Sequence, residues 1–151
     1  MITALLLGLV MFVVTSCVLA IPLAALVTIA TGKHAYKLTR PSYAGNAIVL
    51  QIMGLLVAVA HLANIGLWAV LLGVCGEFDS YDLAYYHSAV NYTSLGYGDL
   101  VMSPRWRLLG PLETLDGIVK LGITTAVMFA LLTRLIQRRV KAKEPEHEPA
   151  S

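Results

Sequence analysis

Residues 92–99, with the sequence YTSLGYGD, lie between two long apolar segments and contain two glycines, Gly96 and Gly98, separated by one residue. A strand whose successive carbonyl groups point to one side needs alternate residues in conformations that a Cβ disfavours, and glycine adopts them at low cost. We therefore expect the carbonyls of residues 94–97, with the Ser94 hydroxyl at the inner end, to form layers of oxygen atoms along an axis. Such layers can replace the water shell of a cation that crosses a membrane. One chain cannot close a ring of oxygens, so the stretch predicts several copies around the axis.

Residues 93–99 resemble the T-T-V-G-Y-G-D selectivity filter of potassium channels, with Ser94 for the second threonine and Leu95 for valine. Upstream, residues 86–91 occupy the place of the family's pore helix. Downstream, residues 122–125 are similar to the Gly-Ile-Thr-Ser stretch of a bacterial channel's inner helix. The resemblance covers about residues 46–137 and is to the bacterial-type potassium channel pore-domain family, a module of two transmembrane helices.

The resemblance also implies roles for individual residues. K+ would be coordinated by Ser94, Leu95, Gly96 and Tyr97. Filter geometry and the outer mouth would depend on Gly98 and Asp99. Support from behind the filter would come from Thr93, Tyr86 and His87, the last two bracing Tyr97 where many relatives have tryptophans; ordinary packing is the alternative for this pair. Val90 stands where some relatives have an acidic partner for the filter aspartate, so Asp99 must find another partner or face water.

The composition places the chain among membrane proteins. Of the 151 residues, 58% are hydrophobic and only 13% are charged, and the mean hydropathy is +0.74, whereas soluble domains carry about 25% charged residues. No charged side chain occurs in residues 1–32, 41–76 or 121–133. About 20 apolar residues are needed to cross a bilayer, so the first two runs qualify outright, and the third needs inspection. We predict an all-α membrane protein with three transmembrane helices, a re-entrant pore helix and a filter loop, assembling as a tetramer.

The predicted organisation follows the chain in four parts. They are an extra N-terminal transmembrane helix over 1–32, a cytoplasmic loop over 33–45, an ion-channel pore domain over 46–137 and a cytoplasmic tail over 138–151. Within the pore domain we expect the outer helix at 46–75, the pore helix at 80–93, the filter at 94–99 and the inner helix at 111–137. The first run has no basic residue before it and continues too far for a signal peptide, so we expect it to be retained, with Pro22 kinking its inner half.

The basic residues predict the orientation. Three lie in the first loop and five follow the last span, which places eight of the eleven Lys and Arg on one side: Lys33, Lys37, Arg40, Arg134, Arg138, Arg139, Lys141 and Lys143. Only Arg105 and Arg107 lie in the opposite connection. Short basic loops stay in the cytoplasm, so the N-terminus and the filter loop should face outside and the C-terminus inside. We expect a multi-pass protein of the cell membrane, plasma or inner.

The pore helix is predicted from a polar turn before a short amphipathic segment. Asp79 can cap the helix, and Asp82 complements its positive end. At 12 to 14 residues or so, the helix is too short to span a bilayer, as a re-entrant helix should be. Its C-terminal dipole would point at the membrane centre and favour a cation there.

Several polar residues lie inside the predicted spans. A lone His61 can be a proton relay or a ligand, but the interpretation we favour is a hydrogen-bonded packing residue that contacts the first span or the last helix together with Asn64. Trp68 fits an interfacial position near the outer end of its helix.

The last helix should begin near Pro111, which suits a first helical turn. Glu113, Asp116 and Lys120 share one stripe of this helix. We predict an Asp116–Lys120 ion pair behind the filter; the alternative is a Lys120 that projects into the pore and repels cations. Gly122 is a candidate hinge, or else a close-packing contact.

These observations predict a potassium-selective channel subunit that conducts K+ passively as a homotetramer with three further copies of itself in the lipid bilayer. No cofactor is expected beyond the permeant K+, and no nucleic-acid partner. One alternative is a non-selective monovalent cation channel, since Ser94 and Leu95 alter the inner half of the filter. Another is a non-conducting membrane subunit with a pore-like fold. An enzyme is not expected, because the four histidines lack metal-ligand spacing and no nucleophile and base pair stands out.

Overall fold

The computed structural model describes residues 1–31 and 43–141, and every regular element within them is an α-helix. The helices in chain order are α1 (Ile2–Thr31), α3 (Tyr43–Val74), α4 (Tyr81–Tyr92) and α5 (Leu109–Lys141). Three of these are long and apolar enough to cross a membrane, over Ile2–Thr28, Ala47–Val74 and Leu109–Arg134. The predicted all-α membrane fold with three spans and one short helix is therefore confirmed.

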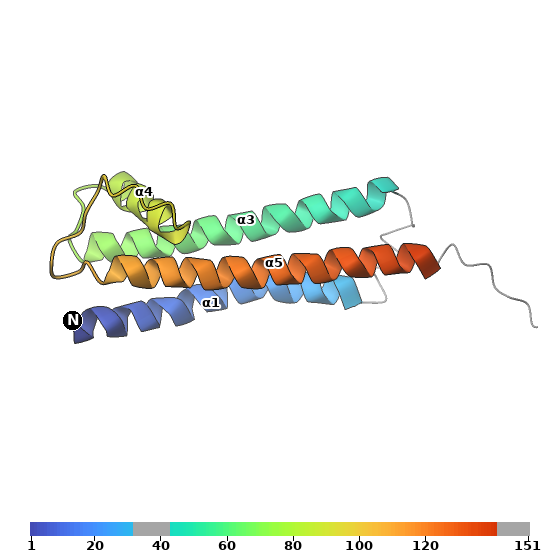
Figure 1. Ribbon diagram of the computed structural model, residues 1–151, viewed down its shortest axis with the longest axis horizontal. Coiled ribbons are helices and arrows are strands. Elements are labelled where there is room, and N and C mark those ends of the chain that lie inside the picture. Colours follow the sequence, from blue (N-terminus) through green and yellow to red (C-terminus); the bar gives the residue numbers. More distant parts are fainter. Residues whose placement is uncertain (32–42, 142–151) are drawn as a thin grey trace, which may run out of the picture.

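The three long helices run side by side, and α4 with its following loop lies at one end of them (Figure 1). This is the end at which α3 stops and α5 starts, and the N-terminus of α1 lies there too. Both α1 and α4 pack against α3 and α5. Of the predicted cytoplasmic segments, residues 33–42 and 142–151 lie outside the described residues, while 43–45 and 138–141 continue α3 and α5.

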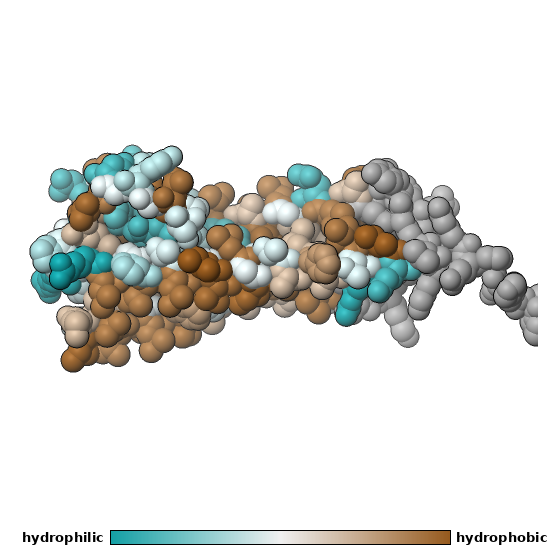
Figure 2. Space-filling view, in the orientation of Figure 1, coloured by the Kyte–Doolittle hydropathy of each residue, from teal (hydrophilic) through white to brown (hydrophobic). Residues whose placement is uncertain are grey.

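Apolar side chains cover the long helices from the outside. Figure 2 shows them along the length of the bundle, with hydrophilic residues gathered at the end that carries α4. Leu6 is 58% exposed, Val59 is 55% exposed and Phe129 is 70% exposed. Exposed apolar side chains of this kind on three helices of spanning length suit contact with lipid or with further subunits.

One stripe of α1 faces the other helices. Its buried residues follow the three- and four-residue spacing of a single helical face: Ala4, Gly8, Met11, Thr15, Leu19 and Leu26. Pro22 lies inside this helix, as predicted from the sequence. The helix α1 is therefore packed along α3 and α5 over most of its length.

The ends of α4 and α5 differ slightly from the predictions. Ser80, and not Asp79, is the N-cap of α4, because its hydroxyl accepts from the Leu83 amide at 3.3 Å, the third residue of the helix. Asp82 lies in the first turn, as predicted. The last helix begins at Leu109, so that Pro111 is within its first turn, where a missing N–H leaves no partner unsatisfied.

Among the glycines of the described residues, Gly117 of α5 lies closest to another helix. A Cβ at this position would lie 2.0 Å from the carbonyl oxygen of Tyr92, the last residue of α4. Only glycine lets the two backbones meet here, because that oxygen belongs to a helix end and cannot swing away as a side chain would. Gly117 therefore sets the distance between the inner helix and the end of the pore helix.

We predict that Gly117→Ala lowers the free energy of unfolding by about 1–3 kcal/mol through overpacking. Gly54→Ala is the matched control, since a Cβ there meets nothing within 4 Å and alanine favours a helix by up to about 1 kcal/mol. The measurement is reversible unfolding of each variant in detergent. Equal stability of the two variants would contradict the close contact.

Candidate functional site

Residues 93–99 follow α4 as a segment that belongs to no helix or sheet, which we call the strand, and it begins as a helix cap. The Ser94 amide donates to the Asn91 carbonyl at 2.9 Å, and the Leu95 amide donates to the Val90 carbonyl at 2.9 Å. Together with a φ of 62° at Ser94, these two bonds form a Schellman motif, which usually places glycine at the left-handed position. The helix α3 ends with the same pair of bonds, and there Gly76 takes the left-handed position, with a φ of 72°.

Left-handed residues then alternate along the strand. Gly96 has a φ of 61° and Gly98 a φ of 72°, whereas Leu95 and Tyr97 between them do not have positive φ. The predicted glycine conformations are thus present, and Ser94 extends the alternation by one residue. A serine in this conformation costs about 1–2 kcal/mol, which the two cap hydrogen bonds offset. The alternation is the backbone pattern that turns successive carbonyls to one side.

The strand is open on the single chain. Leu95 is 55% exposed and Tyr97 is 67% exposed, and the remaining residues of 93–99 are exposed as well. The Gly96 amide adds a third contact with the end of α4, donating to the Val90 carbonyl at 3.3 Å. The strand therefore contacts α4 through amides at its inner end and presents its other surface outward.

Asp99 finds its partner on α4. The Tyr86 hydroxyl donates to Asp99 Oδ2 at 2.8 Å, and this hydrogen bond raises the pKa of Tyr86. An acidic residue at position 90 is therefore not needed to hold the outer end of the strand. Tyr86 acts on Asp99 within one chain, and the predicted bracing of Tyr97 by Tyr86 stays a prediction.

His87 lies beside Tyr86 but is buried against other groups. Its Nε2 is 2.8 Å from Asn91 Nδ2, one turn later on α4, and its ring centroid is 4.9 Å from that of Phe78. Burial lowers the pKa of His87, which favours the neutral ring that can accept from the amide. Within the described chain, His87 thus contacts α4 and also the backbone of Leu100, just after the strand. Its predicted contact with Tyr97 stays a prediction.

The inner end of α4 is held by a polar group that the sequence did not single out. Tyr92 is 1% exposed, and its hydroxyl lies 3.0 Å from Nδ1 of His61 and 3.4 Å from Nδ2 of Asn64. Nε2 of His61 lies 3.3 Å from the Thr124 hydroxyl of α5. The prediction that His61 is a hydrogen-bonded packing residue in contact with the last helix is confirmed, and Asn64 contacts α4 instead. The next residue, Thr93, donates its hydroxyl to the Ala89 carbonyl at 2.7 Å.

The inner helix contacts α4 through backbone as well as side chains. The Thr114 hydroxyl is 3.0 Å from the Asn91 carbonyl, in line with the Gly117 contact three residues later. Glu113 is fully buried on the same helix near Ser88 and Asn91 of α4. Among the described residues, its carboxylate oxygens and the Ser88 hydroxyl have no hydrogen-bond partner. At Gly122, a Cβ would meet nothing within 4 Å, so close packing inside the described chain occurs at Gly117 and not at Gly122. The hinge role of Gly122 stays a prediction.

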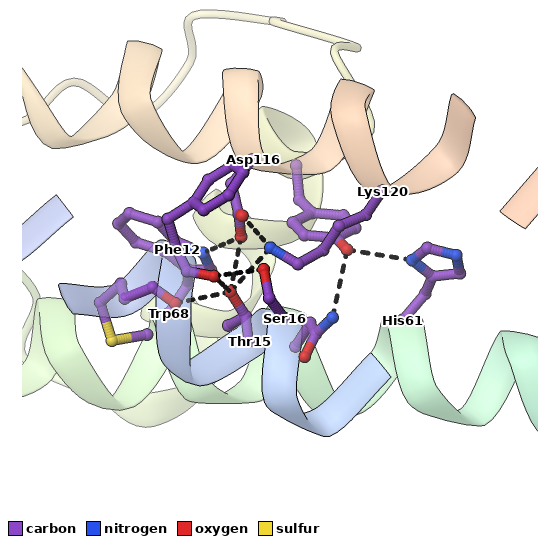
Figure 3. Close-up of polar contacts among 10 residues, drawn as sticks. Phe12, Thr15, Ser16, His61, Trp68, Asp116 and Lys120 are labelled. Atoms are coloured by element: carbon purple, nitrogen blue, oxygen red, sulfur yellow. Dashed lines mark hydrogen bonds and ion pairs between the residues drawn. The ribbon is translucent and has the colours of Figure 1, made fainter. Parts of the chain in front are cut away.

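Two charged residues of α5 pair inside the bundle. Lys120 and Asp116 form the predicted ion pair, and both are buried. Lys120 is 1% exposed and is directed at α1 (Figure 3), so the alternative of a lysine that projects into the pore is wrong. Trp68 is not interfacial: it is fully buried and its Nε1 donates to Asp116 Oδ2 at 2.9 Å. A buried carboxylate needs donors, and the indole N–H supplies one.

A comparison with protein families identifies the module to which this geometry belongs. The sequence profile described as "Ion channel", a module of two transmembrane helices, matches residues 57–134, which is just over half of the chain. The chain belongs to the ion channel family. The match spans most of α3, all of α4, the strand and most of α5, and it is consistent with a bacterial-type potassium channel pore domain. No curated protein and no solved structure matches the chain significantly.

Family membership and the three spans make this channel a multi-pass membrane protein. The matched region contains both the strand of residues 93–99 and the helices that hold it. The first helix, α1, precedes the match and is an addition to the family's module.

We predict that Tyr86→Phe loosens the outer end of the strand, because Asp99 loses its hydroxyl donor. Amide hydrogen exchange in residues 96–100 should become roughly tenfold faster or more, because a hydrogen bond to a charged group contributes about 1.5–3 kcal/mol. Tyr85→Phe is the control, since the Tyr85 hydroxyl donates to the Leu62 carbonyl and not to the strand. Unchanged exchange in Tyr86→Phe would show that Asp99 is held by something else.

Proposed function

We propose that this ion channel is a homotetramer that conducts K+ selectively and passively. The observation that carries the proposal is the left-handed alternation at Ser94, Gly96 and Gly98. A backbone of this kind can aim consecutive carbonyls at one axis, and rings of backbone carbonyls replace the hydration shell of K+ in selective pores.

In the proposed pore, the ion ligands come from the strand. Carbonyl oxygens of Ser94, Leu95, Gly96 and Tyr97 form the layers, and the Ser94 hydroxyl completes the innermost one. Gly98 allows the left-handed backbone conformation at the outer end of the strand. Asp99, which accepts a hydrogen bond from Tyr86, lies at the outer mouth of the pore. Ions move in single file because each arriving cation repels the one ahead of it. The ion is cargo, so no cofactor and no chemical conversion are involved.

The tetramer is proposed because each chain supplies one strand. Rings of carbonyls around an axis need several copies, and fourfold cyclic symmetry gives each layer four oxygens. The exposure of Leu95 and Tyr97 on the single chain supports this arrangement, since neighbouring subunits would cover these side chains. The partners are thus three further copies of the chain and the surrounding lipid bilayer.

In the proposed orientation, the strand lies toward the outer face of the cell membrane, which is either a plasma membrane or an inner membrane. The basic residues favour a cytoplasmic first loop and tail. The N-terminus of α1 lies at the same end of the bundle as α4, so an external N-terminus and an external filter are compatible in one chain.

The function is tested by fluxes of K+ and Na+ through purified protein in liposomes. Wild-type protein should pass K+ in preference to Na+. Gly96→Ala should reduce the K+ flux by roughly tenfold or more, since an alanine at a φ of 61° costs about 1–2 kcal/mol and displaces the carbonyls. Gly73→Ala is the matched control, because a Cβ there meets nothing within 4 Å.

The outcomes separate the candidate functions. Equal fluxes of K+ and Na+ would favour a non-selective monovalent cation channel. Absence of flux from an assembled tetramer would favour a non-conducting subunit. Equal K+ fluxes from Gly96→Ala and Gly73→Ala would show that the strand does not line the conduction path.

The oligomeric state has its own prediction. The mass of the protein in detergent, after subtraction of the detergent, should be four times the chain mass of 16.3 kDa. Light scattering coupled to size-exclusion chromatography gives this number. A stable dimer or monomer would contradict the fourfold ring.

A further inference from the structure

A cluster of buried polar side chains joins the first helix to the inner helix. We call Thr15, Trp68, Asp116 and Lys120 the Thr15 cluster; they come from α1, α3 and α5, and none is more than 1% exposed. Figure 3 shows the four side chains directed toward one another between the helices. Polar and charged groups at this depth of a membrane protein are costly unless they satisfy one another.

Asp116 receives donors from all three helices. Lys120 of α5 donates to its Oδ1, and Trp68 of α3 donates to its Oδ2 at 2.9 Å. The Thr15 hydroxyl of α1 also lies 2.9 Å from Oδ2, as a donor. The carboxylate is thus surrounded by groups from different parts of the chain, and α1 supplies one of them.

Lys120 makes two contacts with α1, whereas Asp116 makes one. Its Nζ donates to the Thr15 hydroxyl at 2.9 Å and lies 4.5 Å from the ring centroid of Phe12, also on α1. Thr15 is suited to this position because one hydroxyl both accepts from Lys120 and donates to a carboxylate. The Met11 carbonyl, at 2.6 Å, competes for the same proton. A cation over an aromatic face is further stabilised when it is removed from water.

The cluster is adjacent to the contact that sets the filter's position. Asp116 directly precedes Gly117. The Tyr92 carbonyl of α4 occupies the space that a Cβ at position 117 would need. The Tyr92 carbonyl is two residues before Ser94, the first left-handed residue of the strand. A shift of Asp116 toward or away from α1 therefore shifts Gly117 against the end of the pore helix.

We propose that the first helix positions the filter: Thr15 and Phe12 hold the Asp116–Lys120 pair, and the pair holds α5 against the end of α4. This inference rests on the proposed function, because it assigns Thr15 a positioning role in selective K+ conduction. It gives α1 a task beyond anchoring the chain in the bilayer.

The test compares three substitutions in the full-length protein in liposomes. Thr15→Val keeps the shape and removes the hydroxyl, and Thr15→Ser keeps the hydroxyl. Ser16→Ala is the matched control, because the Ser16 hydroxyl donates at 2.6 Å to Phe12 O of its own helix. The measured quantity is the ratio of K+ to Na+ flux, which a loss of folded protein alone does not change.

We expect Thr15→Val to lower this ratio by roughly fivefold or more, because the buried Lys120 ammonium loses the Thr15 acceptor and keeps Asp116 as its partner. Thr15→Ser and Ser16→Ala should keep the wild-type ratio. A ratio in Thr15→Val equal to that in Ser16→Ala would overturn the inference.

A double-mutant cycle shows whether Thr15 acts through the charged pair. In an Asp116→Leu/Lys120→Met background the pair is replaced by apolar side chains, which buried ion pairs often tolerate. Adding Thr15→Val should then change the ratio by less than about twofold. An equal effect of Thr15→Val on the flux ratio in both backgrounds would overturn the inference. If Thr15→Val by itself prevents assembly, the same substitution is tested in the Asp116→Leu/Lys120→Met background. Restored assembly there supports the inference, and continued failure to assemble overturns it.

A spectroscopic arm separates this inference from the proposed function. The chain has two tryptophans, so Trp106→Phe leaves Trp68 as the one indole. The emission of Trp68 should shift on Thr15→Val, because its acceptor Asp116 rearranges, and should not shift on Ser16→Ala. A wild-type protein that passes no K+ would overturn the proposed function alone, whereas Trp68 emission unaffected by Thr15→Val would overturn the inference.

Discussion

A strand that pairs with no other strand has to be stabilised by the helix next to it, and the packing of the whole channel depends on this constraint. Residues 94–98 alternate left-handed backbone conformations, which no sheet or helix would stabilise. Their support comes from α4: the Val90 carbonyl accepts from the amides of Leu95 and Gly96 at the inner end, and Tyr86 holds Asp99 at the outer end. The strand is therefore only as well positioned as α4, and the other helices matter because they fix that short helix.

The fixing relies on close backbone contact and on polar groups that satisfy one another inside the bundle. Gly117 brings α5 against the last carbonyl of α4, and the Tyr92 hydroxyl joins His61 and Asn64 of α3. Apolar packing provides little discrimination between helices in lipid, since the tails are equally apolar. A buried hydrogen bond or ion pair has few alternative partners there, so it selects one arrangement. In this channel such groups lie where α3, α4 and α5 meet and where α1 joins them.

The sequence predicted the elements better than their contacts. Two uncharged runs longer than a bilayer is thick predicted the first two spans, and the spacing of Gly96 and Gly98 predicted their left-handed conformations. Ser94 was missed as a left-handed residue because its identity gives no sign that it closes a helix cap. Trp68 was placed at the interface because an amphipathic ring fits there equally well, and its acceptor Asp116 lies 48 residues away on another helix. Thr15 in an apolar run does not reveal its partners, and Gly117 stood outside the family motif that drew attention to Gly122.

The proposed roles of the individual strand residues rest on backbone geometry, and only an assembled channel can display them. Anomalous diffraction from crystals of the assembled protein grown with Rb+ in place of K+ tests them most directly. Peaks on the symmetry axis at the levels of the Ser94 to Tyr97 carbonyls are expected, with Gly96 and Gly98 still left-handed. Carbonyls turned away from the axis, or Rb+ found only outside the strand, would contradict a conducting filter at this site.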